Sequence, residues 1–585
     1  MLLRLERLIL FGLVAVAASA LVTLPSSARA VTAPAAWDGV PEFSMDRGWA
    51  GVVTVATRFP RRWSGGPDRQ AAAEWIAGAL AGMGLDVRRE TFPAYLGARA
   101  PVTLENVWGI SPGSERAAEI VVVVGNYDMA PTSVQAASDT AGHVGTILEL
   151  ARLLAAAPHR RTFIFFFPDG EEWGMLGTRR FVQTFPQRRQ IVAALSIEDL
   201  DVGRFAALGI DGTGQSRGFA PYWLRGFAAD AARREGVRTD EVSPLSEWLL
   251  RSLLVSQTDQ GPFLAAGVPA IDLAGRSDDL ALKRAVYHLP GDTIEKMRPE
   301  SVVAYGRVQE RILRGLDALP AVPRGSSYYL RIAPDRIVPA PALAVRQGLV
   351  FLPLAVAVLL RRRRLGPLRA PFASESMRGG VVFAALLIWV ASIKLLPFLG
   401  LLPRYAVYPP PPRHPLLTTP LWLPIIISAV ILVAAIVAAE ALLRRREERR
   451  AMDAAEAGGR IATMLIWLLV VALVALYDNP FGAVTFLLCP AALWLWITPG
   501  PSPVRRAVNG VLVLLGFAVV VLLLAQYGAD LRIGGYILWY VFLALAYAQF
   551  TPLQIALTFA TLAVGVRLLA LAALGRATAT ASASP

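Results

Sequence analysis

The stretch FFFPDGEEWG, residues Phe165–Gly174, joins a buried-strand pattern to an unusual pair of acids. Its apolar run stops at Pro-Asp-Gly, which predicts a buried β-strand that ends in a turn. Glu171 and Glu172 follow directly in that turn. Adjacent carboxylates at a strand end repel each other unless a cation or a proton separates them. The pair therefore indicates either a solvated turn or a metal site that carries its own base.

Strand-like and helix-like segments alternate around this stretch, over residues 35–325. Strand patterns occur at EIVVVVGNYD, IVAALSIEDLDVG and VPAIDLAG, and helical patterns at QAAAEWIAGALAGMGLDV and HVGTILELARLLAAA. Strands that alternate with helices of about 10–15 residues predict an α/β domain with a mostly parallel central sheet. Functional side chains in such sheets gather at the carboxyl ends of the strands.

The second part of the chain is strongly apolar and basic. Hydrophobic residues make up 55% of the 585 residues and the mean hydropathy is +0.48, which is too apolar for a purely soluble protein. Residues 341–585 carry 21 Lys and Arg against 8 Asp and Glu, whereas residues 1–340 carry 37 against 36. Because the positive excess lies between apolar runs, it indicates cytoplasmic loops, and we expect no nucleic-acid partner.

Eight apolar runs predict an all-α transmembrane region over residues 346–575. They lie near residues 347–360, 380–402, 417–443, 461–477, 481–498, 507–527, 534–550 and 553–574, and the last two could instead form a re-entrant hairpin. Basic clusters follow the first, third and fifth runs, at Arg361–Arg364, Arg444–Arg450 and Val504–Arg506. Since positive loops stay in the cytoplasm, the clusters place the α/β domain on the extracytoplasmic side of the cell membrane.

The remaining segments are short. Residues 1–30 carry Arg4 and Arg7 before an apolar run and end in Ala-Arg-Ala, as in a signal peptide or an uncleaved signal anchor. A proline-containing linker is expected over residues 326–345, and a disordered tail over residues 576–585. The single cysteine, Cys489, excludes an intrachain disulfide and a zinc site built on cysteines.

Six segments of the α/β domain have the residues and the order of a known family. They read GNYD, SDTAGHVGTILE, FPDGEEWGMLGT, SIEDLDVG, TDQGPFLAAGVPA and YHLPGDT. Over about residues 50–310 the chain resembles the zinc-dependent aminopeptidases of the twenty-eighth metallopeptidase family and the related glutaminyl cyclases. The resemblance implies a three-layer, zinc-exopeptidase-like domain.

The resemblance also implies a role for each residue of a first zinc site. Asp139 aligns with the carboxylate that bridges two zinc ions, and Glu172 and His288 align with the other protein ligands of the first ion. Glu171 aligns with the general base that takes a proton from water. Supporting roles are expected for residues of the same segments, namely Asp128, Tyr287 and Asp292.

The second zinc site departs from the family pattern. Its acidic ligand aligns with Glu198, or with Asp199 if the register shifts by one residue. Its histidine is replaced by Asn126, a poor zinc ligand, and a further family histidine is replaced by Gln260. His143 lies four residues after Asp139, so it could take over as a ligand, although a packing role is the first expectation.

The resemblance implies a membrane-bound zinc aminopeptidase that removes N-terminal residues from peptides outside the cytoplasm. One zinc ion is expected, with a second left open by the change at Asn126. The expected partners are a peptide substrate and the lipid bilayer. Two alternatives follow from the altered site: a pseudopeptidase that binds peptides without cleaving them, and a single-zinc cyclotransferase similar to glutaminyl cyclases.

Overall fold

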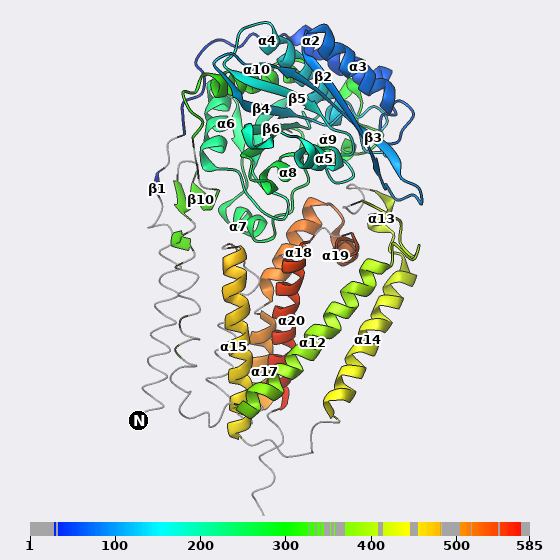
Figure 1. Cartoon of the computed structure of the whole chain (residues 1–585), viewed down its shortest axis with the longest axis vertical. Helices are drawn as coiled ribbons and strands as arrows, with labels where there is room; N and C mark the ends of the chain where they lie inside the picture. Colours follow the sequence, from blue (N-terminus) through cyan, green and yellow to red (C-terminus); the bar gives the residue numbers. More distant parts are fainter. Residues whose placement is uncertain are drawn as a thin grey trace, which may run out of the picture.

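A computed structural model shows an α/β domain that lies at one end of a group of apolar helices (Figure 1). It describes residues 29–30, 33–343 apart from 324, 326, 334, 335 and 340, 369–406, 414–444, 454–479, and 503–574 apart from 516, 548 and 549, with isolated positions elsewhere. The predicted signal segment, except residues 29–30, and the predicted tail lie outside these residues.

The centre of the α/β domain is an eight-stranded mixed sheet of order β2-β3-β5-β4-β6-β9-β7-β8. Its four middle strands, β5, β4, β6 and β9, run parallel, whereas β2, β3 and β7 each have antiparallel neighbours. The predicted α/β class is confirmed, with the parallel part confined to the middle and to β7–β8. The strands are β2 Asp86–Ala94, β3 Val102–Ser111, β4 Arg116–Val124, β5 Arg161–Phe167, β6 Ile191–Glu198, β7 Phe205–Asp211, β8 Arg238–Asp240 and β9 Ala270–Ser277.

Helices cover both faces of the sheet, so the domain has three layers, with the sheet in the middle. Alternate residues of β4 and β5 point to opposite sides, because side chains in a strand alternate. Val123 and Phe165 join the core under α2, α4 and α10, whereas Val122 and Phe166 pack with Phe181 of α5. The helices are α2 Met45–Arg58, α3 Arg69–Gly82, α4 His143–Ala155, α5 Leu176–Thr184, α6 Tyr222–Arg234, α7 Pro244–Leu253, α8 Gln260–Ala265, α9 Leu280–Val286 and α10 Pro299–Ala318.

The register of the parallel strands decides where the site forms. Val124 at the end of β4 pairs with Phe166 of β5 on one side and with Ser196 of β6 on the other. The three strands therefore end at one edge of the sheet. The segments that follow β4 and β5, together with the last residue of β6, Glu198, meet there.

Residues 326–345 differ from the predicted linker. They contain β10 Tyr329–Ala333 and β11 Arg336–Pro339, and β11 also pairs with β1 Arg29–Ala30. The apolar side chains of Leu330 and Val338 are buried in one small cluster, and this packing favours a hairpin over an open linker.

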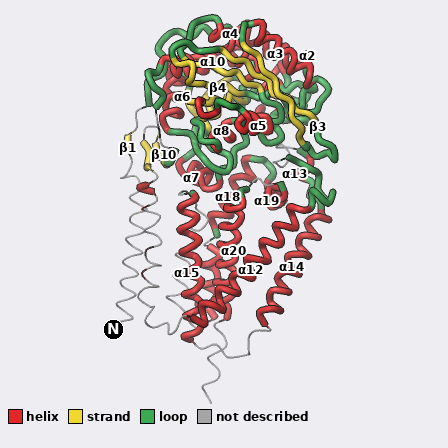
Figure 2. The backbone as a smooth tube through the Cα atoms, viewed as in Figure 1, coloured by secondary structure: helices red, strands yellow, loops and turns green. Residues whose placement is uncertain are grey.

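The second region consists of helices joined by turns and loops where it is described (Figure 2). Four of its helices are long and apolar enough to cross a membrane: Pro371–Leu395, Trp422–Ala439, Gly459–Asp478 and Pro552–Leu571. They belong to α12 Arg369–Leu395, α14 Trp422–Arg444, α15 Ala454–Asp478 and α20 Pro552–Leu574. They coincide with four of the eight predicted runs.

The other four predicted runs are not seen as single long helices. The runs at residues 347–360 and 481–498 fall largely outside the described residues. The run at 507–527 is divided between α17 Pro503–Leu515 and α18 Ala518–Asp530. The run at 534–550 contains α19 Ile537–Ala546, whose 10 residues are too few for the about 20 needed to span a bilayer. The count of eight spans stays a prediction.

Candidate metal centre

The turn after β5 presents the two glutamates of the opening stretch. All seven residues of β5 are buried, so the strand is fixed in the sheet. The backbone oxygen of Glu171 accepts hydrogen bonds from Gly174 and Met175, and its own N–H donates to Asp128 Oδ1 at 3.1 Å. Glu172 is buried, whereas Glu171 remains partly open to the pocket. The local hydrogen bonds therefore hold the two side chains in different surroundings.

Asp139, Glu172 and His288 form a first buried cluster. His288 Nε2 lies 3.1 Å from Asp139 Oδ2 and 3.3 Å from Glu172 Oε1. One ligand atom from each residue lies within 4.8 Å of the others. Glu172 Oε1 is buried and has no hydrogen-bond partner in the described part of the chain. Two carboxylates and one imidazole at this spacing are a ligand set suited to zinc.

Backbone contacts hold the ligands of this cluster in place. Asp292 accepts hydrogen bonds from the backbone N–H groups of Ser138 and Asp139 at 2.9 and 3.3 Å. Thr132 donates from Oγ1 to the backbone oxygen of His288 at 2.7 Å, and His288 itself has a positive φ of 55°. Asp292, expected as a supporting residue, thus fixes the turn that carries Asp139.

Asp139 also belongs to a second buried cluster, with His143 and Glu198. His143 Nε2 lies 2.8 Å from the backbone oxygen of Asn126, while Nδ1 is buried and has no hydrogen-bond partner within the described residues. A carbonyl oxygen only accepts, so Nε2 carries the proton of the neutral ring and Nδ1 keeps its lone pair. The lone pair of Nδ1 is therefore not engaged within the described residues, and a ring nitrogen of His143 lies within 4.8 Å of ligand atoms of Asp139 and Glu198.

The other candidates for the second site point elsewhere. The amide of Asn126 donates to Asp128, and Asn126 belongs to neither cluster. Asp199 pairs with Lys283 at 2.9 Å, so its carboxylate is already neutralised. Gln260 donates from Nε2 to Asp211 at 3.3 Å. Of the two acids proposed from the sequence, the structure brings Glu198 into the cluster.

The centre holds several acids in a poorly solvated space. Burial raises the pKa of Glu172 to about 8, and the neighbouring Asp139 and Asp128 add to the rise while His288 opposes it. Burial and nearby acids also raise the pKa values of Glu171 and Glu198 well above their ordinary range. Such a set of acids is destabilised when ionised, and a divalent cation between them relieves the repulsion.

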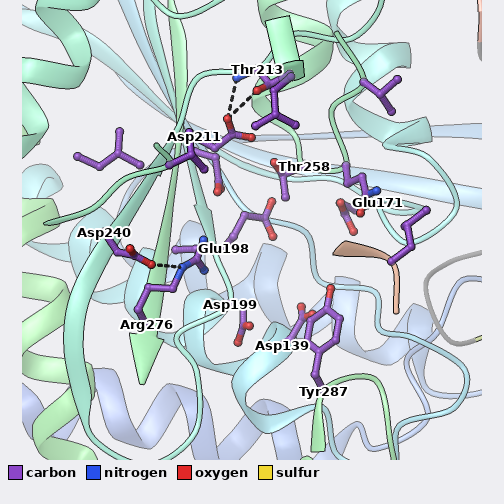
Figure 3. A pocket seen from close by; sticks show the side chains of 18 of the residues that line it. Asp139, Glu171, Glu198, Asp199, Asp211, Thr213, Asp240, Thr258, Arg276 and Tyr287 are labelled. Carbon is purple, nitrogen blue, oxygen red and sulfur yellow. Dashed lines mark hydrogen bonds and ion pairs between the residues drawn. The ribbon is translucent and has the colours of Figure 1, made fainter. Parts of the chain in front are cut away.

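The clusters open into a pocket of about 480 Å³. Figure 3 shows Asp139, Glu171 and Glu198 around this space, with Asp211 further along the wall. Further residues that line it were not singled out from the sequence, among them Asp211, Asp272, Arg276, Tyr527 and Arg532. Asp211 ends β7, which runs antiparallel to β9, so the rule for the carboxyl ends of parallel strands would not have found it, and no local signal marks a residue of the helical region such as Arg532.

An α/β domain with such clusters at its strand ends has the architecture of a metal-dependent hydrolase. Residues 106–313 match the sequence model of Peptidase family M28. The α/β domain of this chain is therefore similar to peptidase family M28 over these residues, in agreement with the resemblance of its motifs.

Curated relatives match part of the chain. A probable zinc metalloprotease of Pyrenophora tritici-repentis is 26% identical over 307 residues, which cover 43% of this chain and 62% of that protein. A vacuolar membrane protease of Clavispora lusitaniae is 28% identical over 191 residues, which cover 32% of this chain and 17% of that protein. The matched part is less than two thirds of either relative.

Solved structures also align with about half of the chain. A zinc aminopeptidase from Bacillus subtilis aligns with a TM-score of 0.41 and 14% identity, over 49% of this chain and 100% of that chain. A glutaminyl cyclase from Porphyromonas gingivalis aligns with a TM-score of 0.38 and 17% identity, over 46% of this chain and 98% of that chain.

Proposed function

We propose that this protein is a membrane-bound zinc aminopeptidase that hydrolyses the N-terminal peptide bond of peptides outside the cytoplasm. The observation that carries the proposal is the cluster of Asp139, Glu172 and His288 beside Glu171 in one pocket. The family match supports peptidase chemistry. The cytoplasmic basic clusters predicted from the sequence support the location of the domain.

Asp139, Glu172 and His288 would hold a zinc ion, because each offers a ligand atom and Glu172 Oε1 has no hydrogen-bond partner in the described part of the chain. When bound, zinc supplies Lewis-acid polarisation of the scissile carbonyl and lowers the pKa of water. The protein's own proton carrier is Glu171, whose side chain lines the same pocket and is not in either cluster. It would accept a proton from the attacking water and pass it to the leaving amine.

The acidic wall of the pocket supports cleavage at a free N-terminus. Glu198, Asp211 and Asp272 line the pocket that also contains Glu171. Asp272 Oδ1 is buried and has no hydrogen-bond partner within the described residues. A free α-ammonium group would neutralise Asp211 and Asp272 and satisfy that oxygen, whereas an internal peptide segment brings no positive charge.

We also propose that the protein binds a second zinc ion through Asp139, His143 and Glu198. The change to Asn126 removes an imidazole from one element, and the ring of His143 supplies one from the start of α4. The unpaired Nδ1 of His143 supports this assignment. A shared Asp139 would then bridge the two ions.

Hydrolysis of short peptides by the purified full-length protein tests the proposed function. The wild type with zinc should release the N-terminal residue, and Glu171→Gln should reduce kcat by about 100-fold or more, since general-base catalysis contributes about 10²–10⁴. Equal zinc content in both proteins shows that the loss is not a loss of metal. Release of ammonia without peptide cleavage would point to cyclotransferase chemistry, and an equally active Glu171→Gln would refute the proposed role.

A further inference from the structure

The helical region contacts the α/β domain on two sides of the metal centre. The ring of Tyr405, in the loop between α12 and α14, stacks on Trp173 with their centroids 5.7 Å apart. Trp173 directly follows Glu172 in the chain. Elsewhere Asn479 donates from Nδ2 to the backbone oxygen of Arg251 at 2.7 Å. These contacts hold the two regions together close to the site.

The connection between α18 and α19 reaches the pocket itself. Leu531 and Ile533 are buried, with 3% and 4% of their surface exposed, and they hold this connection in place. Arg532 between them is exposed and has a φ of 57°, a left-handed conformation that is disfavoured for residues other than glycine. Strained residues held by their neighbours often mark functional positions.

The side chain of Arg532 is directed toward the metal centre. Its guanidinium carbon lies 5.7 Å from the centre of the Tyr287 ring. That ring stacks on the ring of His288, with their centroids 3.9 Å apart. Arg532 is therefore one aromatic ring away from a proposed zinc ligand.

Arg532 differs in its ion pairing from the other basic residues that line the pocket. The pocket is lined by three further basic residues, and each is neutralised within the protein, through the ion pairs Arg225–Glu247 at 3.1 Å, Arg276–Asp240 at 3.6 Å and Lys283–Asp199 at 2.9 Å. Figure 3 shows the pair of Arg276 and Asp240. In the part of the chain that the structure describes, Arg532 has no ion pair with a carboxylate. Its charge is available to a ligand.

We propose that the helical region completes the substrate site, and that Arg532 binds a carboxylate of the peptide substrate. Guanidinium groups bind carboxylates through two parallel hydrogen bonds, which suits a specific contact of this kind. A pocket of about 480 Å³ fits a small ligand, so the carboxylate belongs to a short peptide. It is either the C-terminal carboxylate or an acidic side chain. The inference rests on the proposed peptidase function and assigns the membrane region a role in substrate selection.

Three tripeptides distinguish these sources in the full-length zinc-loaded protein. They are Leu-Ala-Ala with a free C-terminus, the same peptide as its C-terminal amide, and Leu-Glu-Ala amide. We expect the wild type to prefer one of the two carboxylate-bearing peptides over Leu-Ala-Ala amide by roughly tenfold in kcat/KM, as expected for one charged hydrogen-bonded contact. Arg532→Gln should abolish this preference through KM, and Arg532→Lys should restore part of it.

The same three peptides are used with a control variant, and they also give the results that would contradict the inference. Arg47→Gln, which removes an exposed arginine on α2 outside the pocket, should keep the preference of the wild type. A wild type without any carboxylate preference would overturn the inference. So would an Arg532→Gln variant that keeps the preference, or one that loses all three activities equally, because the latter indicates a structural role through Tyr287.

Calorimetric binding separates this inference from the proposed function. The same peptides are titrated into Glu171→Gln and into Glu171→Gln/Arg532→Gln, so no hydrolysis is required. Tighter binding of a carboxylate-bearing peptide by the first protein alone supports the inference even if the wild type cleaves nothing. Identical peptide preferences in both proteins would contradict it even if the wild type is an active peptidase.

Discussion

The ring of His143 is held by the backbone oxygen of Asn126, 2.8 Å from Nε2. By the resemblance of its motif, Asn126 aligns with a histidine that binds zinc in the family, and here its main-chain oxygen contacts the ring of a different histidine. The second ring nitrogen of His143, Nδ1, has no hydrogen-bond partner among the described residues, and His143 belongs to one cluster with Asp139 and Glu198. A hydrogen bond from the other ring nitrogen to a backbone oxygen commonly orients a histidine that binds a metal ion.

The arrangement predicts unequal effects of two substitutions on metal content. His143→Ala should reduce zinc from about two ions per chain to about one, because it removes one of three protein ligands from the second site. Asn126→Ala should leave about two ions, since its carbonyl oxygen remains. Metal analysis of the purified proteins by mass spectrometry measures both. Unchanged zinc in His143→Ala would exclude His143 as a ligand.

The acidic wall predicts a requirement for a free N-terminus. N-acetylation of a peptide substrate should abolish its cleavage, because the acetyl group removes the positive charge. Asp272→Asn should raise KM for the free peptide by about tenfold with a smaller change in kcat, as expected for a lost charged contact. Asp46→Asn is the control, since Asp46 is exposed on α2, outside the pocket. Equal effects of both substitutions on KM would argue against an ammonium site at Asp272.

We expect Glu247 to stabilise the folded protein to an extent that depends on pH. Although burial alone would raise its pKa, Arg225, Arg251 and Arg331 hold the pKa of Glu247 below the ordinary value. Glu247→Gln should lower the free energy of unfolding by about 3–5 kcal/mol, because it leaves buried arginines unpaired. Thermal unfolding followed by tryptophan fluorescence should show a Tm lower by about 5 °C or more.

The sign of the pH effect follows from the lowered pKa of Glu247. The stabilisation is fully present above the ordinary carboxyl pKa of about 4.3 and is lost as the pH falls through the lower folded pKa. The difference in Tm between wild type and Glu247→Gln should therefore shrink in acid. Glu90→Gln, which alters an exposed pair with Arg180, should change stability by less than about 1 kcal/mol. A constant Tm difference at all pH values would contradict this account of Glu247.

The basic loops predict the orientation of the domain. In a Cys489→Ser background, Arg47→Cys places a thiol on exposed α2 of the α/β domain. A membrane-impermeant maleimide should label it in spheroplasts. Arg446→Cys, in the predicted cytoplasmic cluster, should be labelled only after permeabilisation. The reverse pattern would place the α/β domain in the cytoplasm.

The sequence predicts local elements well and distant contacts poorly. The run before Glu171 becomes β5, because seven consecutive buried residues require a central strand. The ends of β4, β5 and β6 meet as expected of parallel strands, and Asp139 comes close to Glu172 in one cluster and to Glu198 in the other. These outcomes follow from periodicity and strand order.

Other features depend on contacts that no local pattern encodes. The free Nδ1 of His143 depends on the carbonyl oxygen of Asn126, which any residue type could provide. Arg532 reaches the pocket only because the helical region packs against the α/β domain, about 245 residues after His288 in the chain. The hairpin of β10 and β11 replaces a predicted linker because its apolar side chains find a shared cluster.

The most direct measurement is the zinc content of the purified full-length protein, compared with that of Glu172→Ala. Glu172 is a proposed ligand of the first ion alone, and its Oε1 has no hydrogen-bond partner among the described residues. We predict about two zinc ions per wild-type chain and about one fewer in Glu172→Ala, whose residual hydrolysis should be negligible. A wild type that binds no zinc, or a Glu172→Ala variant with unchanged zinc, would contradict the proposed metal centre.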